Sequence, residues 1–136
     1  MSIDLVDTGV VHAGTYNGNP IGLAAVGATL DVLGAPTVYD ELDDTSARLE
    51  VAMRSALAEL PTNPTIRRIG SLIVVAEDEL PEADRLWPQI TERLLYKNVV
   101  ALPSGKIFVS TEHTDKDTEL MQHALTESVD HLSARV

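Results

Sequence analysis

The sequence predicts an α+β fold in which helices cover a small, mainly antiparallel sheet. Apolar residues recur at helical spacing in two early segments, and a β-branched run follows at residues 65–77. A third helical pattern, two short apolar runs and a last helical pattern come after it. The predicted order is helix, helix, strand, helix, strand, strand, helix, which is typical of an α+β domain.

The first helix is predicted to begin where Asn19 meets Pro20. Asn caps exposed backbone N–H groups, and proline at the first helical position gives up no hydrogen bond that the helix needs. Gly34 and Pro36 are expected to end this helix. One side of the helix is slim enough for a closely packed neighbour and carries Gly22, Ala24 and Gly27.

The second helix is predicted at residues 37–60, as one long amphipathic helix. Acidic residues crowd its first turns, where they favour the helix dipole, and this indicates a solvated helical face and not a metal site. Pro61 and Pro64 are expected to end it. Residues 65–77 are then predicted as one strand, in which Gly70 marks a bulge or a close approach.

A polar connector at residues 77–84 leads to a third helix, which starts close to Asp84 because Pro88 fits only in a first turn. Asn98 ends that helix. Strands at residues 99–102 and 107–111 flank a turn at residues 103–106 and are predicted to pair as a hairpin. Thr114, with Asp117 three residues on, resembles a capping box and predicts the start of the last helix.

Length, charge and composition limit the function classes. The 136 residues suit one small domain, and the net charge of −11 argues against a nucleic acid or an anionic membrane as a partner. The absence of cysteine excludes disulfides and thiolate metal sites. The sequence has no basic, apolar leader and no apolar run of the roughly 20 residues that a membrane helix needs, so the expected location is the cytoplasm.

The loop at residues 14–18 is the main candidate site. Gly14 and Gly18 permit backbone conformations closed to other residues, Thr15 adds a hydroxyl and Asn17 adds an amide. Placed directly before a helix start, these groups suit a phosphate. The same residues also make an ordinary capped turn, and the loop alone does not separate the two interpretations.

The histidines and lysines do not indicate a second site. His113 stands among acids that could suggest a metal ion, but capping of the last helix explains the pattern without one. His123 and His131 are two helical turns apart and are expected at the surface or at its boundary with the core. His12 could face a cofactor pocket or have a packing role. The lysines are expected at a helix end, a turn and a helix start: Lys97, Lys106 and Lys116.

Four segments carry recognisable motifs. Residues 12–25 read His-x-Gly-Thr-Tyr-x-Gly-Asn-Pro-Ile-x-x-Ala-Ala, residues 69–73 read Ile-Gly-Ser-Leu-Ile, and residues 110–117 read Ser-x-x-His-Thr-x-x-Asp. The fourth segment, residues 94–100, is the end of a predicted helix before a predicted strand. These segments resemble the class III aminotransferases, and in particular the glutamate-1-semialdehyde aminomutases. Together they extend over nearly the whole chain, in the order that the family has.

The resemblance implies the C-terminal portion of a fold-type I enzyme that uses pyridoxal 5'-phosphate, either a transaminase or an aminomutase, which is an isomerase. It divides the chain into a lead segment with a phosphate-contacting loop, residues 1–19, and a C-terminal small domain, residues 20–136. In that family the Gly-Thr pair contacts the phosphate of the cofactor bound to the other subunit, which implies Gly14 and Thr15 as cofactor-binding residues. The implied partners are the catalytic large domain or a second copy of the enzyme, as a homodimer.

The resemblance also implies that this chain is a fragment. The family's Schiff-base lysine and pyridine-binding aspartate lie upstream of the matched segments, so the chain is expected to hold no catalytic residue, no covalently bound cofactor and no activity alone. The turn at residues 103–106 is short and lacks the aminomutase glutamate, so an aminotransferase for another amine or amino acid suits the sequence equally well. The alternative is a stand-alone binding or interaction module that kept the fold.

Overall fold

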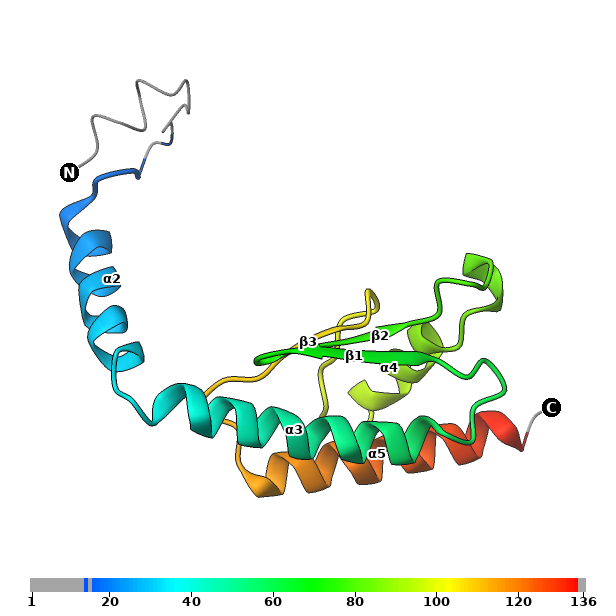
Figure 1. Ribbon diagram of the computed structural model, residues 1–136. Helices are drawn as coiled ribbons and strands as arrows, with labels where there is room; N and C mark the ends of the chain where they lie inside the picture. Colours follow the sequence, from blue (N-terminus) through cyan, green and yellow to red (C-terminus); the bar gives the residue numbers. More distant parts are fainter. Residues whose placement is uncertain (1–13, 15, 135–136) are drawn as a thin grey trace. The chain divides into compact units, whose positions relative to one another are not determined.

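The structure is a computed structural model that describes residue 14 and residues 16–134. His12 and Thr15, two of the residues singled out in the sequence, lie outside the described residues. The chain divides into two compact units, residues 1–38 and residues 39–136. The first unit is blue to cyan in Figure 1, and the second runs from cyan to red.

The described part of the first unit is a loop followed by helix α2 (Pro20–Leu33). The helix begins and ends where the sequence predicts: Asn19 is its N-cap, and the Gly34 N–H donates to the Leu30 carbonyl over 2.8 Å. Apolar residues occupy all of its sides, Asp31 is its one charged residue, and none of its residues is buried. A helix of this composition normally lies inside a larger structure.

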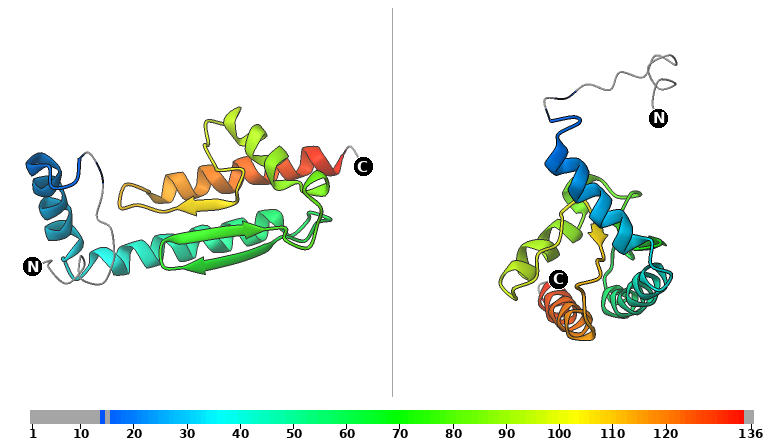
Figure 2. Two further views of the ribbon diagram at one scale, coloured as in Figure 1. Left: turned by 90° about the horizontal axis from the view of Figure 1, so that it is seen from above. Right: turned by 90° about the vertical axis from the view of Figure 1, so that its left-hand side faces the viewer.

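The second unit joins a three-stranded antiparallel sheet to three α-helices. The elements are α3 (Val38–Leu57), β1 (Thr65–Ile69), β2 (Leu72–Ala76), the 3₁₀ helix η1 (Glu82–Asp84), α4 (Trp87–Leu95), β3 (Lys106–Phe108) and α5 (Asp115–Ser133). The sheet has the order β1-β2-β3. In Figures 1 and 2, α3 and α5 lie side by side on one face of the sheet, and α4 lies beside α5. This confirms the α+β prediction.

The prediction of one strand at residues 65–77 is wrong, because this segment folds into a hairpin. Thr65 pairs with Ala76 and Ile69 with Leu72, so the chain reverses at Gly70 and Ser71. Gly70 has a φ of 54°, a left-handed conformation that glycine adopts at little cost. A two-residue turn with a positive φ matches the twist of the two strands, which is why the glycine marks a reversal and not a bulge.

The predicted hairpin at residues 99–111 is also wrong. Residues 99–102 form no strand, and β3 pairs instead with β2, through Leu72 with Phe108 and Ile73 with Ile107. The predicted turn itself is present, since the Gly105 N–H donates to the Leu102 carbonyl over 3.0 Å. Other donors occupy the carbonyls of this segment: the Trp87 indole N–H binds Leu102, and the Val75 N–H binds Gly105.

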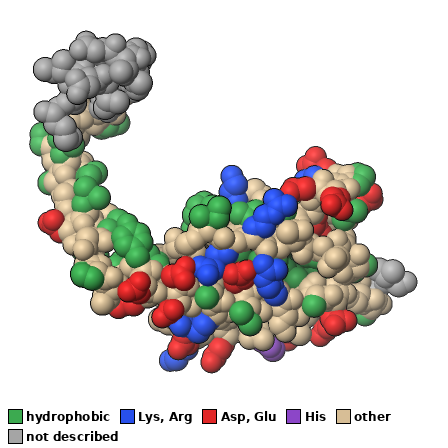
Figure 3. All heavy atoms as spheres, in the orientation of Figure 1, with side chains coloured by type: hydrophobic (Ala, Val, Ile, Leu, Met, Phe, Trp, Pro, Cys, Tyr) green, Lys and Arg blue, Asp and Glu red, His purple; other side chains and the backbone are tan. Residues whose placement is uncertain are grey.

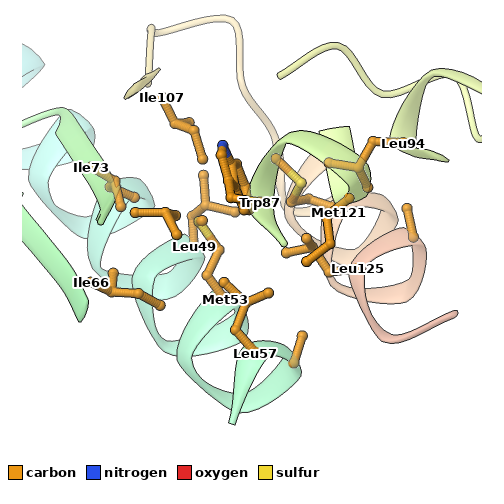
Figure 4. Close-up of a cluster of buried hydrophobic side chains, with 14 of the residues drawn as sticks. Leu49, Met53, Leu57, Ile66, Ile73, Trp87, Leu94, Ile107, Met121 and Leu125 are labelled. Carbon is orange, nitrogen blue, oxygen red and sulfur yellow. The ribbon is translucent and has the colours of Figure 1, made fainter. Parts of the chain in front are cut away.

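The hydrophobic core lies between the sheet and the three helices. Figure 4 shows labelled side chains from α3, α4, α5 and the strands pointing toward one another. The core residues of α3 recur at helical spacing, as its amphipathic pattern predicts. The side chains that are at least 98% buried include Met53, Leu57, Ile73, Ile90, Leu94, Leu125 and Val129.

Helix α4 takes its N-terminal cap from a distant residue. The buried carboxylate of Glu77 accepts hydrogen bonds from the backbone N–H groups of Leu86, over 3.2 Å, and Trp87, over 2.9 Å. Leu86 precedes the helix and supplies no capping side chain. Pro88 lies within the first turn, as predicted, although the helix starts three residues after Asp84. The connector predicted as polar therefore contains the residue that positions α4.

An ion-pair network joins the hairpin to α3. The Glu50 carboxylate accepts from Arg54 over 2.7 Å and from Arg68 over 2.9 Å, and Arg68 also donates to Asp43 over 2.5 Å. Arg54 in turn donates to the Ile66 carbonyl over 2.5 Å. These hydrogen bonds, first from Arg54 and then from Arg68, lower the pKa of Glu50 below its ordinary value of 4.5. Figure 3 shows acidic and basic side chains interleaved along this side of α3.

Gly105→Ala should destabilise the protein far more than Gly70→Ala, although both glycines have a positive φ. A Cβ at Gly105 would lie 2.0 Å from the Val75 carbonyl oxygen, whereas none of the described residues comes within 4 Å of a Cβ at Gly70. We expect about 1–2 kcal/mol from backbone strain at Gly70 and about 2–5 kcal/mol at Gly105, where overpacking is added. Urea unfolding measures both values, and equal losses would contradict the close approach.

Glu77→Ala should lower the free energy of unfolding by about 1–3 kcal/mol, because two backbone N–H groups at the start of α4 lose their acceptor. Glu79→Ala is the matched control, since Glu79 is exposed in the same connector. Thermal and urea unfolding compare the stabilities of the two variants, and hydrogen exchange measures the protection of the backbone N–H groups in the first turn of α4. A loss of stability in the Glu79 variant of the same size would show that the connector, and not the cap, is responsible.

Removing the Glu50 carboxylate should flatten the acid side of the stability profile. The pKa of Glu50 is lower in the folded than in the unfolded chain, so its stabilisation is complete above the unfolded pKa and is lost as the pH falls through the folded pKa. We expect Glu50→Gln to be less stable than the parent at pH 7 and to lose less stability below about pH 4.5. Urea unfolding across this pH range, with Glu41→Gln as the control on the same helix, tests this.

Candidate functional site

The loop before α2 consists of two overlapping turns. The Asn17 N–H donates to the Gly14 carbonyl over 3.0 Å, and the Asn19 N–H donates to the Tyr16 carbonyl over 3.1 Å. Gly18, at the third position of the second turn, has a φ of 76°, which glycine adopts readily at this position. The predicted conformational role of Gly18 is therefore confirmed.

Gly14 lies close to the Asn17 side chain within the first turn. A Cβ at this position would lie 2.9 Å from the side-chain oxygen of Asn17, so the Asn17 amide occupies the space beside the Gly14 backbone. The loop thus brings a glycine backbone and a side-chain amide together. The sequence identifies both residues as polar or flexible, but their contact depends on the turn geometry.

Hydrogen-bond donors remain available in this loop. Asn19 Oδ1 accepts from the N–H groups of Ile21, over 2.9 Å, and Gly22, over 3.4 Å, so the first donors of the helix are used by its own cap. The N–H groups of Tyr16 and Gly18 have no acceptor among the described residues. No acidic residue stands in the first turn of α2 to offset the positive end of its dipole. These groups would suit an anion.

Tyr16 belongs to the motif at residues 12–25, and this residue is 82% exposed between the two glycines of the loop. An exposed aromatic ring on a loop with free N–H donors can cover one side of a bound group. The signal in the sequence is a single aromatic residue flanked by small and polar residues. Thr15, the predicted hydroxyl of the site, lies outside the described residues.

A cavity of about 370 Å³ in the second unit is the other candidate. Its lining is mainly apolar and includes Leu49, Ile107 and Met121, with Lys106, His113 and Asp117 among its polar groups. The carboxylate of Asp117 is engaged by the side chain and backbone N–H of Thr114, both over 2.7 Å, and these hydrogen bonds lower its pKa. The capping box predicted from the sequence is thus confirmed, and it accounts for the hydrogen bonds of the Asp117 carboxylate.

Three histidines and all three lysines lie apart from the loop in the sequence, whereas His12, two residues before Gly14, lies outside the described residues. The Ser110 N–H donates to His113 Nδ1 over 3.1 Å, which makes this ring nitrogen an acceptor. Lys97 pairs with Glu127, and that ion pair lowers the Glu127 pKa; His123 lies 3.5 Å from the same carboxylate. Lys106 begins β3 and Lys116 lies in the first turn of α5. Among residues 14 and 16–134, no group of three or more His, Asp or Glu side chains could hold a metal ion.

No single described helix is long and apolar enough to cross a membrane. Helices α2 and α3 pass that test by length and composition only when they are counted together as a bent pair.

The sequence matches the family model of the class III aminotransferases over residues 3–125. A glutamate-1-semialdehyde 2,1-aminomutase of Thermus thermophilus is 34% identical over 132 residues, which is 88% of this chain and 31% of that protein. A homologue from Chlorobium luteolum is 34% identical over 82% of this chain and 28% of its own length. The chain thus spans about a third of the length of the curated relatives it matches.

Solved structures have the same fold. A transaminase with bound pyridoxal phosphate superimposes with a TM-score of 0.80 over 93% of this chain and 31% of its own, at 23% identity. The glutamate-1-semialdehyde aminomutase of Pseudomonas aeruginosa gives a TM-score of 0.75 over 88% of this chain and 29% of its own, at 24% identity. The family-model match extends over most of the chain and the fold agrees with it, so the chain belongs to the class III aminotransferase family.

Proposed function

We propose that this chain is the C-terminal portion of an aminotransferase or aminomutase that depends on pyridoxal 5'-phosphate. The observation that carries the proposal is the family match over residues 3–125, in a chain that spans about a third of its relatives. In this proposal residues 1–19 are the lead segment with the phosphate loop, and residues 20–136 are the small domain. The proposed location is the cytoplasm.

Gly14 and Thr15 would hold the phosphate of the cofactor bound to the other subunit. The loop geometry supports this role, because Gly14 lies against Asn17 and the Tyr16 and Gly18 N–H groups lack acceptors among the described residues. When bound, pyridoxal phosphate supplies an electron sink for carbanion chemistry. The residues of this chain would bind and orient the phosphate end, whereas the covalent attachment to lysine would belong to the preceding part of the enzyme.

The proposed partners are the catalytic large domain and a second copy of the enzyme, as a homodimer. Helix α2 supports this, because it is apolar on all sides and none of its residues is buried. The proposal includes both reaction types, aminomutation and transamination, and each has its own class of substrate. The turn before β3 has Pro103 and Ser104 but no carboxylate after them, so a different amine or amino acid suits this chain as well as an aminomutase substrate.

The alternative function is a stand-alone binding or interaction module derived from the same fold. The reading frame immediately upstream separates the two proposals. A frame that encodes a cofactor domain with the family's lysine, or a separately encoded partner with that domain, favours the enzyme. A genome without either favours the module.

The isolated chain should neither transaminate nor hold pyridoxal phosphate covalently at one residue. Lys97, Lys106 and Lys116 do not match the position of the family's lysine. Incubation with pyridoxal phosphate and an amino donor, followed by absorbance spectroscopy, peptide mapping and a product assay, tests this. Stoichiometric modification of a single lysine together with turnover would contradict the fragment proposal.

Thr15→Val should weaken cofactor binding when the chain is combined with the lysine-bearing portion of the Thermus thermophilus relative. Loss of one hydroxyl that donates to a charged phosphate should lower the affinity about 10- to 150-fold, because hydrogen bonds to charged groups contribute about 1.5–3 kcal/mol. Fluorescence titration with pyridoxal phosphate and with inorganic phosphate gives the affinity independently of turnover. Thr29→Val on α2 is the control, since its hydroxyl binds the Ala25 carbonyl; equal affinities for all three proteins would contradict the phosphate role.

A further inference from the structure

The face of the sheet opposite the helices carries an apolar row. Ile69, Leu72 and Phe108 are directly paired across β1, β2 and β3, so their side chains stand on one face. Ile69 is 82% exposed and Phe108 is 61% exposed. Their neighbours along the strands, such as Ile73 and Ile107, point into the core instead. The row therefore lies outside the hydrophobic core, on the outward face of the sheet.

A second row on the same face carries basic side chains. Arg67 pairs with Val74, and Val74 pairs with Lys106, so two cations flank one aliphatic residue. Neither cation has an ion-pair partner among the described residues. Ile69, Leu72, Phe108, Arg67, Val74 and Lys106 form what we call the sheet patch. In Figure 3 hydrophobic and basic side chains appear together over the strands.

We propose that the sheet patch is the docking surface for the part of the enzyme that this chain does not contain, and that the docked surface combines apolar residues with carboxylates. This inference rests on the proposed function. The chain spans about a third of its curated relatives, so about two thirds of such an enzyme is available to cover a surface of this kind. An apolar row supplies affinity, and the flanking cations select a partner that presents acidic side chains.

A second copy of the same face fits the sheet patch poorly. Face-to-face pairing of two copies would bring Arg67 and Lys106 of one near the same cations of the other, and like charges brought together disfavour association. Two neighbouring cations without an ion-pair partner among the described residues are also unusual in a chain whose net charge is −11. Unpaired basic side chains beside an apolar row therefore favour an acidic partner surface over self-association.

Binding to the lysine-bearing portion of the Thermus thermophilus relative tests the proposal. Ile69→Asp and Phe108→Asp should each weaken binding at least tenfold, and Arg67→Glu combined with Lys106→Glu should slow association. Val51→Asp is the matched control, since Val51 is an aliphatic residue 68% exposed in the groove between α3 and α5. Calorimetry gives the affinities, thermal melting confirms that each variant is folded, and hydrogen exchange reports protection of β1 and β3 on binding.

The outcomes separate this inference from the function on which it rests. Weakened binding by the patch variants, with an unchanged Val51 variant and new protection of the strands, supports the proposal. If the parent chain binds but the patch variants bind equally well, the sheet patch is not the docking surface and the proposed function stands. If the parent chain does not bind at all, both fail. Concentration-dependent dimerisation that Phe108→Asp abolishes would assign the patch to a second copy and overturn the proposal.

Discussion

The contact between Gly105 and Val75 is the constraint on which the third strand depends. The Val75 N–H donates to the Gly105 carbonyl over 2.9 Å, and the two backbones approach this closely because Gly105 has no Cβ. Residues 106–108 then continue along β2 in register. The Trp87 indole binds the Leu102 carbonyl at the start of the same turn, and Glu77 binds the Trp87 backbone N–H. A short series of hydrogen bonds therefore ties β2, α4 and β3 together around one glycine.

The sequence predicted the helices well because their starts and ends are local. Asn19 with Pro20, and Thr114 with Asp117, stabilise helix starts through residues at most three positions apart. The strand pairing was wrong because partner choice depends on contacts between distant segments, such as Gly105 with Val75. The Glu77 cap was missed for the same reason, since an acid in a polar connector looks solvated until the fold brings Leu86 and Trp87 to it.

The candidate site was predictable in part. The two glycines, the Asn17 amide and the helix start are visible in the sequence, and the double turn follows from them. Local chemistry indicates only an anion, however, because a capped turn and a phosphate loop share the same residues. The assignment to a cofactor depends on the family, whose match extends over residues 3–125 and whose order of segments a local turn cannot mimic.

The two kinds of cation in this chain have different roles. Arg54 and Arg68 are held by Glu50 and Asp43, and they fasten the hairpin to α3. Arg67 stands next to Arg68 in β1, but alternation of side chains along a strand places it on the opposite face, where no acid of the described residues reaches it. Of these two adjacent arginines, Arg68 therefore stabilises the fold through its ion pairs, and Arg67 lies on the open face of the sheet. Since a paired cation cannot also select a partner, the strand's alternation separates the surface that stabilises the fold from the surface that remains for recognition.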